Sequence, residues 1–112
     1  MSDCLFCRIV SGDIPADVLL RTDDIVAFRD ISPQAPVHVL VIPVEHHANA
    51  GELAAANPQL AGRLLAAAGE VAALEGLDDY RLVFNTGEDA GQSVFHVHAH
   101  VLGGRSLTWP PG

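Results

Sequence analysis

The hydrophobic pattern near the start of the chain predicts a short amphipathic helix. Within residues 5–10, apolar side chains recur at helical spacing and gather on one side. Asp3 precedes this segment as the expected N-cap, and Gly12 follows it as the expected terminator. We therefore expect an amphipathic lid or packing element at this end of the chain.

The segments that follow have the composition of β-strands. Aliphatic and β-branched runs at 18–22 and 25–29 flank two aspartates, an arrangement that predicts a hairpin. A stiff, proline-containing loop at 32–36 then leads to a nearly unbroken apolar run at 38–42, which ends at Pro43. Because this run is apolar on both faces, it predicts a central strand.

A long helix and two further strands complete the pattern. Asn57 and Pro58 are the expected N-cap and first residue of a helix that continues to about residue 75, where a glycine ends it. Beyond it we expect strands at 81–85 and 94–102, joined by a glycine-containing loop at 86–93. The predicted buried stripe of the helix consists of Leu60, Leu64, Ala67, Ala68, Val71 and Leu74.

Together these elements predict one α+β domain over residues 1–112. The strands are short and antiparallel and the helices are grouped apart from them, which predicts an antiparallel sheet with helices packed on one face. With 49% hydrophobic and 18% charged residues, a chain of 112 residues buries enough surface to form a core without disulfides.

Composition excludes several classes of function. With 14 acidic against 6 basic residues and a net charge of −8, the chain lacks the basic surface that a nucleic acid polymer requires. All six basic residues are arginines, so Schiff-base chemistry and a phosphate-loop lysine are excluded. No run has transmembrane length and no signal peptide is recognisable, so we expect a cytoplasmic protein without a membrane partner.

Three of the six histidines, at positions 96, 98 and 100, alternate with apolar residues. On a strand, this alternation sends the apolar residues to the core and the imidazoles to the other, wet face. Neighbouring imidazoles would stand about 6.5 to 7 Å apart and the outer two about 13 Å apart, so all three cannot converge on one zinc ion. We expect them to supply a nucleophile, an acid or a hydrogen-bond donor, in preference to a solvated edge with incidental histidines.

The loop before these histidines favours a phosphate ligand, because the amides of residues 91–93 and the Ser93 hydroxyl could hold phosphate oxygens beside His98.

The segment 96–102 resembles the signature of the histidine triad family, His-x-His-x-His followed by two apolar positions. Further segments resemble its Hint branch, the purine nucleoside phosphoramidases, and the resemblance covers nearly the whole chain. These segments are Asp-Ile-Ser-Pro-Gln-Ala-Pro at 30–36, Gly-Gln-Ser-Val at 91–94, Val-Leu-Gly-Gly-Arg at 101–105 and Trp-Pro-Pro-Gly at 109–112.

The resemblance implies hydrolysis of a purine nucleoside phosphoramidate to AMP or GMP and an amine, with no cofactor required for catalysis. His98 would attack the α-phosphorus and form a nucleotidyl-histidine, which water then cleaves. His100 would bind the phosphate and protonate the leaving amine, with Ser93 assisting. His96 and His100 would shape and charge the site. His38 would support His98, the alternative being a satisfied structural histidine on the central strand.

The resemblance also implies a nucleotide pocket and a homodimer. Asp30 would accept hydrogen bonds from the ribose hydroxyls, the alternative being a carboxylate that only stabilises a turn. The sheet would continue across the dimer, and each C-terminal tail would bring Trp109 to the leaving-group pocket of the other subunit; the alternative is a tail folded onto its own subunit. The expected nucleotide contacts are Leu5, Phe6, Ile9, Phe28, Asp30, Ile31, Asn85, Gly91, Gln92, Ser93, His98, His100 and Trp109.

The two cysteines raise a separate question. Cys4 and Cys7 have the spacing of half a zinc site, and His46 or the adjacent His47 is a candidate third ligand. The chain is also similar to bacterial relatives in which a structural zinc is held by two cysteines, a histidine and the first histidine of the triad, here Cys4, Cys7, His46 and His96. The alternative is two small buried thiols, and because other relatives fold without the cysteines, zinc is not essential to the fold.

Two other functions stay open from the sequence. One is a dinucleoside polyphosphate hydrolase or nucleotidyltransferase of the same superfamily, which relative rates on phosphoramidate and dinucleotide substrates would separate from a phosphoramidase. The other is a nucleotide-binding regulatory module whose turnover is incidental to its role.

Overall fold

The computed structural model describes residues 3–112, which form an antiparallel sheet with three α-helices. The strands lie in the order β1-β2-β3-β5-β4, every neighbouring pair is antiparallel, and the predicted α+β class is confirmed. Within residues 3–112, no helix has both the length and the apolar character needed to cross a membrane. The elements are α1 (Leu5–Ser11), β1 (Val18–Arg21), β2 (Ile25–Arg29), β3 (Val37–Pro43), α2 (Ala50–Ala56), α3 (Pro58–Leu74), β4 (Tyr80–Val83), a 3₁₀ turn (Glu88–Ala90) and β5 (Ala99–Gly103).

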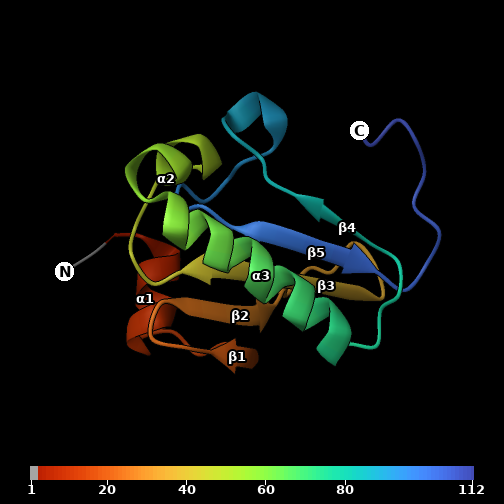
Figure 1. The fold of residues 1–112 in the computed structure, drawn as a ribbon, viewed down its shortest axis with the longest axis horizontal. Coiled ribbons are helices and arrows are strands. Elements are labelled where there is room, and N and C mark those ends of the chain that lie inside the picture. The colour runs from red at the N-terminus through yellow and green to blue at the C-terminus, as the bar shows by residue number, and fades with distance from the viewer. Residues whose placement is uncertain (1–2) are drawn as a thin grey trace.

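The two faces of the sheet bury different sets of side chains. Helix α3 crosses one face (Figure 1), where alternate strand residues such as Val39, Val41 and Val101 meet its buried stripe. On the opposite face, Phe6 and Ile9 of α1 pack against Val26, Phe28, Leu40 and Ile42. The expectation that helices cover one face therefore holds for α2 and α3 but not for α1, since the second face also carries apolar residues that need cover.

The ends of α3 agree with the sequence, and those of α1 agree in part. Gly12 ends α1 in the left-handed conformation with φ 86°, as expected. The N-cap, however, is Cys4 and not Asp3, because the Cys4 sulfur accepts the Cys7 amide hydrogen at 3.4 Å. The predicted burial of Leu74 is also wrong: it lies in the last turn of α3 and is 59% exposed, while Ala72 is buried.

The last strand is shorter than the hydrophobic alternation predicts. Residues 94–98 do not join the sheet, and β5 starts at Ala99, opposite Val41. Other hydrogen bonds replace the strand pairing there, from the Val97 amide to the His47 carbonyl at 2.7 Å and from the Gln92 side chain to the Val94 carbonyl at 3.1 Å. The alternation of sides nevertheless persists, because Val97 still faces the α3 core while the rings of His96 and His98 meet Phe6 of α1.

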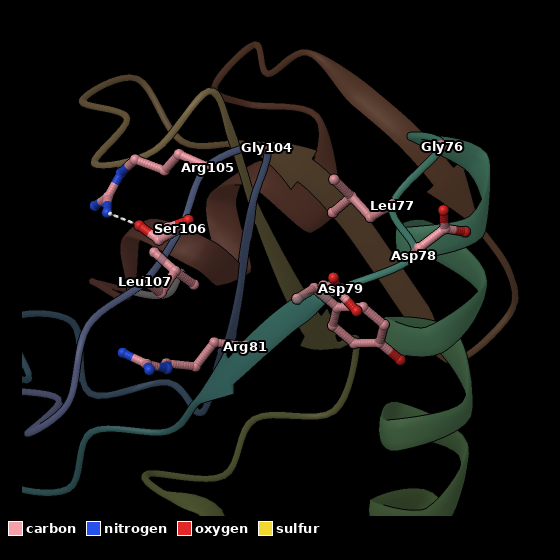
Figure 2. A pocket seen from close by; sticks show the side chains of 10 residues that line it. Gly76, Leu77, Asp78, Asp79, Arg81, Gly104, Arg105, Ser106 and Leu107 are labelled. Atoms are coloured by element: carbon pink, nitrogen blue, oxygen red, sulfur yellow. Dashed lines mark hydrogen bonds between the residues drawn. The ribbon is translucent and has the colours of Figure 1, made fainter.

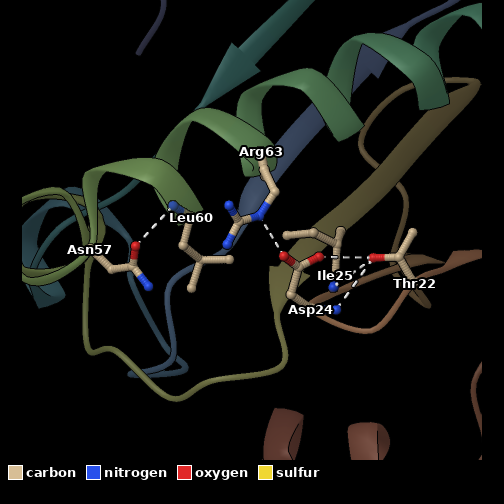
Figure 3. Close-up of polar contacts among 6 residues, drawn as sticks. All are labelled: Thr22, Asp24, Ile25, Asn57, Leu60 and Arg63. Atoms are coloured by element: carbon tan, nitrogen blue, oxygen red, sulfur yellow. Dashed lines mark hydrogen bonds and ion pairs between the residues drawn. The ribbon is translucent and has the colours of Figure 1, made fainter.

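Asn57 joins the two helices on the α3 face. Its backbone ends α2, and its side-chain oxygen accepts the Leu60 amide hydrogen at 3.1 Å at the start of α3 (Figure 3). One turn further, Arg63 pairs with Asp24 in the β1–β2 turn, where Thr22 also bonds Asp24. The hydrogen bond from Arg63 is the main cause that lowers the pKa of Asp24.

We expect Asn57→Ala to lower the free energy of unfolding by about 1 kcal/mol, the usual cost of losing an N-cap. For a domain of this size, this corresponds to a melting temperature lower by about 4 °C, measurable by circular dichroism. Asn57→Asp retains an acceptor oxygen and should melt close to the parent protein. Equal losses in both variants would contradict a capping role.

Candidate active site

A cavity of about 600 Å³ opens on the α1 face of the sheet. Small-molecule sites commonly have this size, and this one combines apolar walls with a few polar groups. Nine of the predicted nucleotide contacts line it: Leu5, Phe6, Ile9, Phe28, Asp30, Ile31, Ser93, His98 and His100. Four others do not, namely Asn85, Gly91, Gln92 and Trp109.

The cavity also has walls that the sequence analysis missed. Leu40 lies opposite Phe28 on the adjacent strand, so strand alternation applied to the segment 38–42 would have found it. The segment 14–17 closes another side, directly after the end of α1, and it carries no periodic signal. The remaining unpredicted lining residues are Arg29 and Val94.

His98 is held in one tautomer. Its Nδ1 donates to the backbone carbonyl of His96 at 2.8 Å, so the lone pair of the neutral ring resides on Nε2. The ring is only 8% exposed, and burial lowers the pKa of His98 below its usual value. At neutral pH the cavity therefore contains an uncharged imidazole with a nucleophilic nitrogen.

A chain of hydrogen bonds also fixes the tautomer of His100. The Gln34 amide donates to His38 Nδ1 at 3.0 Å, so the hydrogen of neutral His38 is on Nε2 and is donated to His100 Nδ1 at 2.9 Å. The hydrogen of His100 must then be on Nε2. This Nε2 is buried and has no hydrogen-bond partner within residues 3–112. An N–H donor without an acceptor is costly, so this atom marks the place of a ligand oxygen.

Asp30 combines a turn role with a place in the cavity wall. One carboxylate oxygen accepts the Ser32 amide hydrogen at 2.8 Å, and the other lies 3.4 Å from His38 Nε2. Asp30 therefore stabilises a turn, as the alternative interpretation expects, and it also lines the cavity.

The loop before the histidines is fastened internally. The amides of Gly91 and Gln92 donate to the carbonyls of Glu88 and Gly87 at 2.9 and 3.0 Å. The Gln92 side chain accepts the Gly87 amide hydrogen and donates to the carbonyls of Ala48 and Val94. These groups therefore have partners within the protein, and of residues 91–93 it is Ser93 that lines the cavity.

Trp109, which is predicted to reach the leaving-group pocket of a second subunit, lies outside the cavity of its own subunit. Trp109 is 81% exposed, and the C-terminal segment extends away from the sheet (Figure 1).

A second hollow of about 570 Å³ lies between the α3–β4 connection and residues 104–107 (Figure 2). Its two arginines hold the chain end, since Arg81 donates to the Thr108 carbonyl and Arg105 to the Gln34 carbonyl, each at 3.0 Å. No histidine lines this hollow among the described residues.

The structure brings Cys4, Cys7, His46 and His96 together, with ligand atoms all within 4.8 Å of one another. His96 Nε2 donates to the Pro43 carbonyl at 2.8 Å, so its Nδ1 lone pair faces the Cys4 and Cys7 sulfurs at 3.3 and 3.5 Å. His46 Nδ1 lies 3.1 Å from His96 Nδ1. Bonds of about 2.0–2.3 Å in a zinc tetrahedron place neighbouring ligand atoms about 3.3–3.8 Å apart, so the four residues fit zinc.

A second cluster, formed by Asp30, His38 and His100, has ligand atoms equally near one another. It does not fit a metal, because both ring nitrogens of His38 are already engaged: Nδ1 accepts from Gln34 and Nε2 carries the hydrogen. A nitrogen that bears hydrogen has no lone pair for a metal ion. His38 is therefore assigned to fixing His100.

We expect the protein to lose stability in mild acid through His100. Burial, followed by the charges of His98 and His38, lowers the pKa of His100 to about 4, and Asp30 opposes this only weakly. The unfolded chain, with a histidine pKa near 6.5, then binds more protons, so stability declines as the pH falls from about 6.5 toward 4. Urea unfolding at a series of pH values should show a smaller decline for His100→Asn than for the parent. Parallel declines would contradict this origin.

Comparison with known proteins shows similarity to one family over most of the chain. The family model described as HIT domain matches residues 11–107. An uncharacterised HIT-like protein of Synechococcus elongatus is 51% identical over 111 residues, which cover 98% of this chain and 97% of that protein. A solved HIT family hydrolase from Legionella pneumophila has a TM-score of 0.94 at 48% identity and covers 98% of this chain and 100% of its own. A histidine triad nucleotide-binding protein from Candida albicans has a TM-score of 0.84 at 30% identity and covers 96% of this chain and 83% of its own.

Proposed function

Because the chain belongs to the HIT domain family, we propose that it is a hydrolase that cleaves purine nucleoside phosphoramidates through a covalent histidine intermediate. The observation that carries the proposal is neutral His98, whose Nδ1–H bonds a carbonyl while Nε2 retains its lone pair beside a cavity of nucleotide size. The names of two solved relatives, a hydrolase and a nucleotide-binding protein, support the same class of function.

The reaction follows from the tautomers of the two histidines. His98 Nε2 bonds to the α-phosphorus while the phosphorus–nitrogen bond breaks, and the departing amine takes a proton from solvent. The adduct places positive charge on the His98 ring, which the His96 carbonyl stabilises through Nδ1–H. Water then attacks phosphorus and gives one proton to solvent, the bond to Nε2 breaks, and a nucleoside monophosphate leaves. Throughout, His100 Nε2–H donates to a phosphate oxygen, and Ser93 lies in the same wall.

The hydrogen bonds favour this donor role for His100 over the expected protonation of the amine. To protonate the amine, His100 would have to carry hydrogen on both ring nitrogens. Its Nδ1 would then be a donor, and His38 Nε2 would have to accept this hydrogen bond instead of donating it. His38 would in turn carry its hydrogen on Nδ1, facing the Gln34 amide hydrogen. Two donors cannot share one hydrogen bond, so neutral His100 is the favoured state.

The apolar side of the cavity suits a purine. Leu5, Ile9 and Phe28 provide flat and aliphatic surface, and Asp30 at the polar end offers a carboxylate oxygen to ribose hydroxyls. Apolar walls recognise the base by burial, while the carboxylate and the histidines fix the sugar and the phosphate.

The test is incubation with an adenosine phosphoramidate, followed by product analysis and intact mass measurement of the rapidly quenched protein. We expect AMP, the free amine and a transient mass increase of one adenylyl group. Faster cleavage of a dinucleoside polyphosphate would assign the protein to the other hydrolases of the superfamily. AMP without an adduct at any time would contradict the covalent route.

We also propose that Cys4, Cys7, His46 and His96 hold a structural zinc ion. The support is the ligand spacing given above, including the Nδ1 atoms of His46 and His96, which lie 3.1 Å apart. A closed set of four protein ligands leaves no open position for substrate, so zinc would supply stability and not chemistry. Cobalt substitution should give the absorption of thiolate-bound tetrahedral Co²⁺, and Cys7→Ser should weaken it. Unchanged spectra would contradict the assignment.

We further propose a homodimer in which the sheets join. β4 is the last strand in the sheet order, and exposed Leu65, Leu74 and Tyr80 lie on α3 and β4. A bare strand edge and apolar surface favour association with a second copy, which would also cover part of exposed Trp109. Light scattering should give twice the chain mass, and Tyr80→Lys should shift the equilibrium to monomer. A monomeric parent protein would contradict the proposal.

A further inference from the structure

Helix α1 belongs to two sites at once. Its N-cap Cys4 and its residue Cys7 belong to the cysteine–histidine cluster, while Leu5, Phe6 and Ile9 of the same helix line the cavity. The helix has only seven residues, and isolated helices of that length are not stable in water. Whatever holds α1 in place therefore also sets one wall of the cavity.

The two ends of α1 are held in different ways. At the C-terminal end, the Gly12 turn, a bond from the Ile14 amide to the Arg8 carbonyl and a bond from Arg21 to the Val10 carbonyl fix the chain. At the N-terminal end, the Cys4 and Cys7 sulfurs face the His96 and His46 rings at 3.3 to 3.5 Å. A metal ion bound to these four residues would convert those contacts into coordinate bonds.

Phe6 links this end of the helix to the reacting nitrogen. It stands between the two cysteines in the sequence and is 4% exposed. Its ring meets the His98 ring edge to face, with centroids 5.0 Å apart, and the His96 ring at 6.0 Å. A shift of the first turn of α1 would therefore change both the wall for the base and the packing on His98.

We propose that Cys4 and Cys7 are positioning residues for the nucleotide, because metal binding at the cysteine–histidine cluster fixes α1 and thereby strengthens binding of the base. The inference rests on the proposed nucleotide function and on the proposed metal site. Coupling between two sites is reciprocal, so the nucleotide must raise the affinity for the metal by the same factor by which the metal raises the affinity for the nucleotide.

The expected coupling is specific to the base. AMP would contact the α1 wall with its purine, whereas ribose 5-phosphate would occupy only the polar end near Asp30, Ser93 and His100. A charge effect of the ion on the phosphate would strengthen both ligands, but fixing α1 would strengthen AMP alone. The two ligands therefore separate a positioned wall from simple electrostatic attraction.

The experiment is calorimetry of AMP and ribose 5-phosphate with protein that has been stripped by a chelator and with the same protein loaded with Zn²⁺. We expect Zn²⁺ to tighten AMP binding by about tenfold, within the usual range of coupling between sites, and to leave ribose 5-phosphate unchanged. Competition with a chelating dye should give a Zn²⁺ affinity about tenfold higher when AMP is present. Hydrogen exchange should show α1 opening in the stripped protein while α3 stays protected.

Two variants separate the role of the cysteines from that of the rest of α1. Cys4→Ser combined with Cys7→Ser should bind AMP as the stripped parent does and ignore Zn²⁺. Ser11→Ala, which removes a side-chain bond at the far end of α1, should keep the full response. AMP binding that is equal with and without Zn²⁺, or equal gains for both ligands, would overturn the inference while leaving the nucleotide function intact. Absence of AMP binding in both forms would overturn both.

Discussion

Replacing His98 with alanine should reduce phosphoramidate turnover by about 10⁴-fold or more, the scale of loss when a covalent nucleophile is removed. The reason is that Nε2 of His98 is the cavity nitrogen whose lone pair is left available by its own backbone hydrogen bond. Adduct formation should disappear together with turnover when intact mass is followed over time. AMP binding should persist, because the apolar wall and Asp30 are unchanged.

His47→Ala is the matched control for this prediction. His47 is a neighbour of the same region through its carbonyl, which accepts the Val97 amide hydrogen, and its ring pairs with Glu45 outside the cavity. The substitution removes an imidazole but spares the backbone bond, so turnover should stay close to that of the parent. A His98→Ala enzyme that still formed the adduct would place the nucleophile elsewhere.

Replacing His100 with alanine should lower turnover by about 10²- to 10³-fold, the usual effect of losing one fixed donor to a charged transition state. The chain from the Gln34 amide through His38 leaves His100 with a single N–H, and that N–H is buried without an acceptor among residues 3–112. Such a donor needs no rearrangement when charge develops on the phosphate oxygens.

A series of substrates with amines of different basicity tests this role of His100. A donor to the phosphate oxygens should give a loss that is the same across the series, because it does not touch the departing nitrogen. Rates of the parent and of His100→Ala, measured by AMP release, provide the comparison. A loss that increases with the basicity of the amine would instead assign protonation of the leaving group to His100.

Much of the fold could be predicted because single elements carried strong local signals. The hairpin, the central strand and the start of α3 are confirmed, since strand composition, an unbroken apolar run and an Asn-Pro cap each act over a few residues. Helix α2 was not predicted, because its seven residues are mainly alanine and show no apolar stripe. Its start depends on Asn49, which accepts the Glu52 amide hydrogen, and its end on Asn57.

The candidate site was also predictable where the signal is local and unpredictable where it depends on distant contacts. Alternation correctly assigned the three triad histidines to one side, but it did not predict that His96 and His98 would be buried. Burial requires α1 to cover that side, and the position of α1 follows from contacts with residues far along the chain, such as Phe28 and Leu40. The tautomers of His38 and His100 depend on the Gln34 amide, a backbone group whose direction no side-chain pattern encodes.

The two-sided sheet has a consequence for how the protein can be altered. Alternate positions of β2 and β3 serve different ends: Ala27, Val39 and Val41 stabilise the α3 core, whereas Phe28 and Leu40 shape the cavity. Phe28 and Leu40 are also core residues of the α1 face, 4% and 6% exposed, so a smaller side chain at either position both widens the cavity and removes buried contacts. A directed change of specificity at these positions therefore costs thermal stability on the α1 face, while the α3 core on the other face can be kept constant to support it.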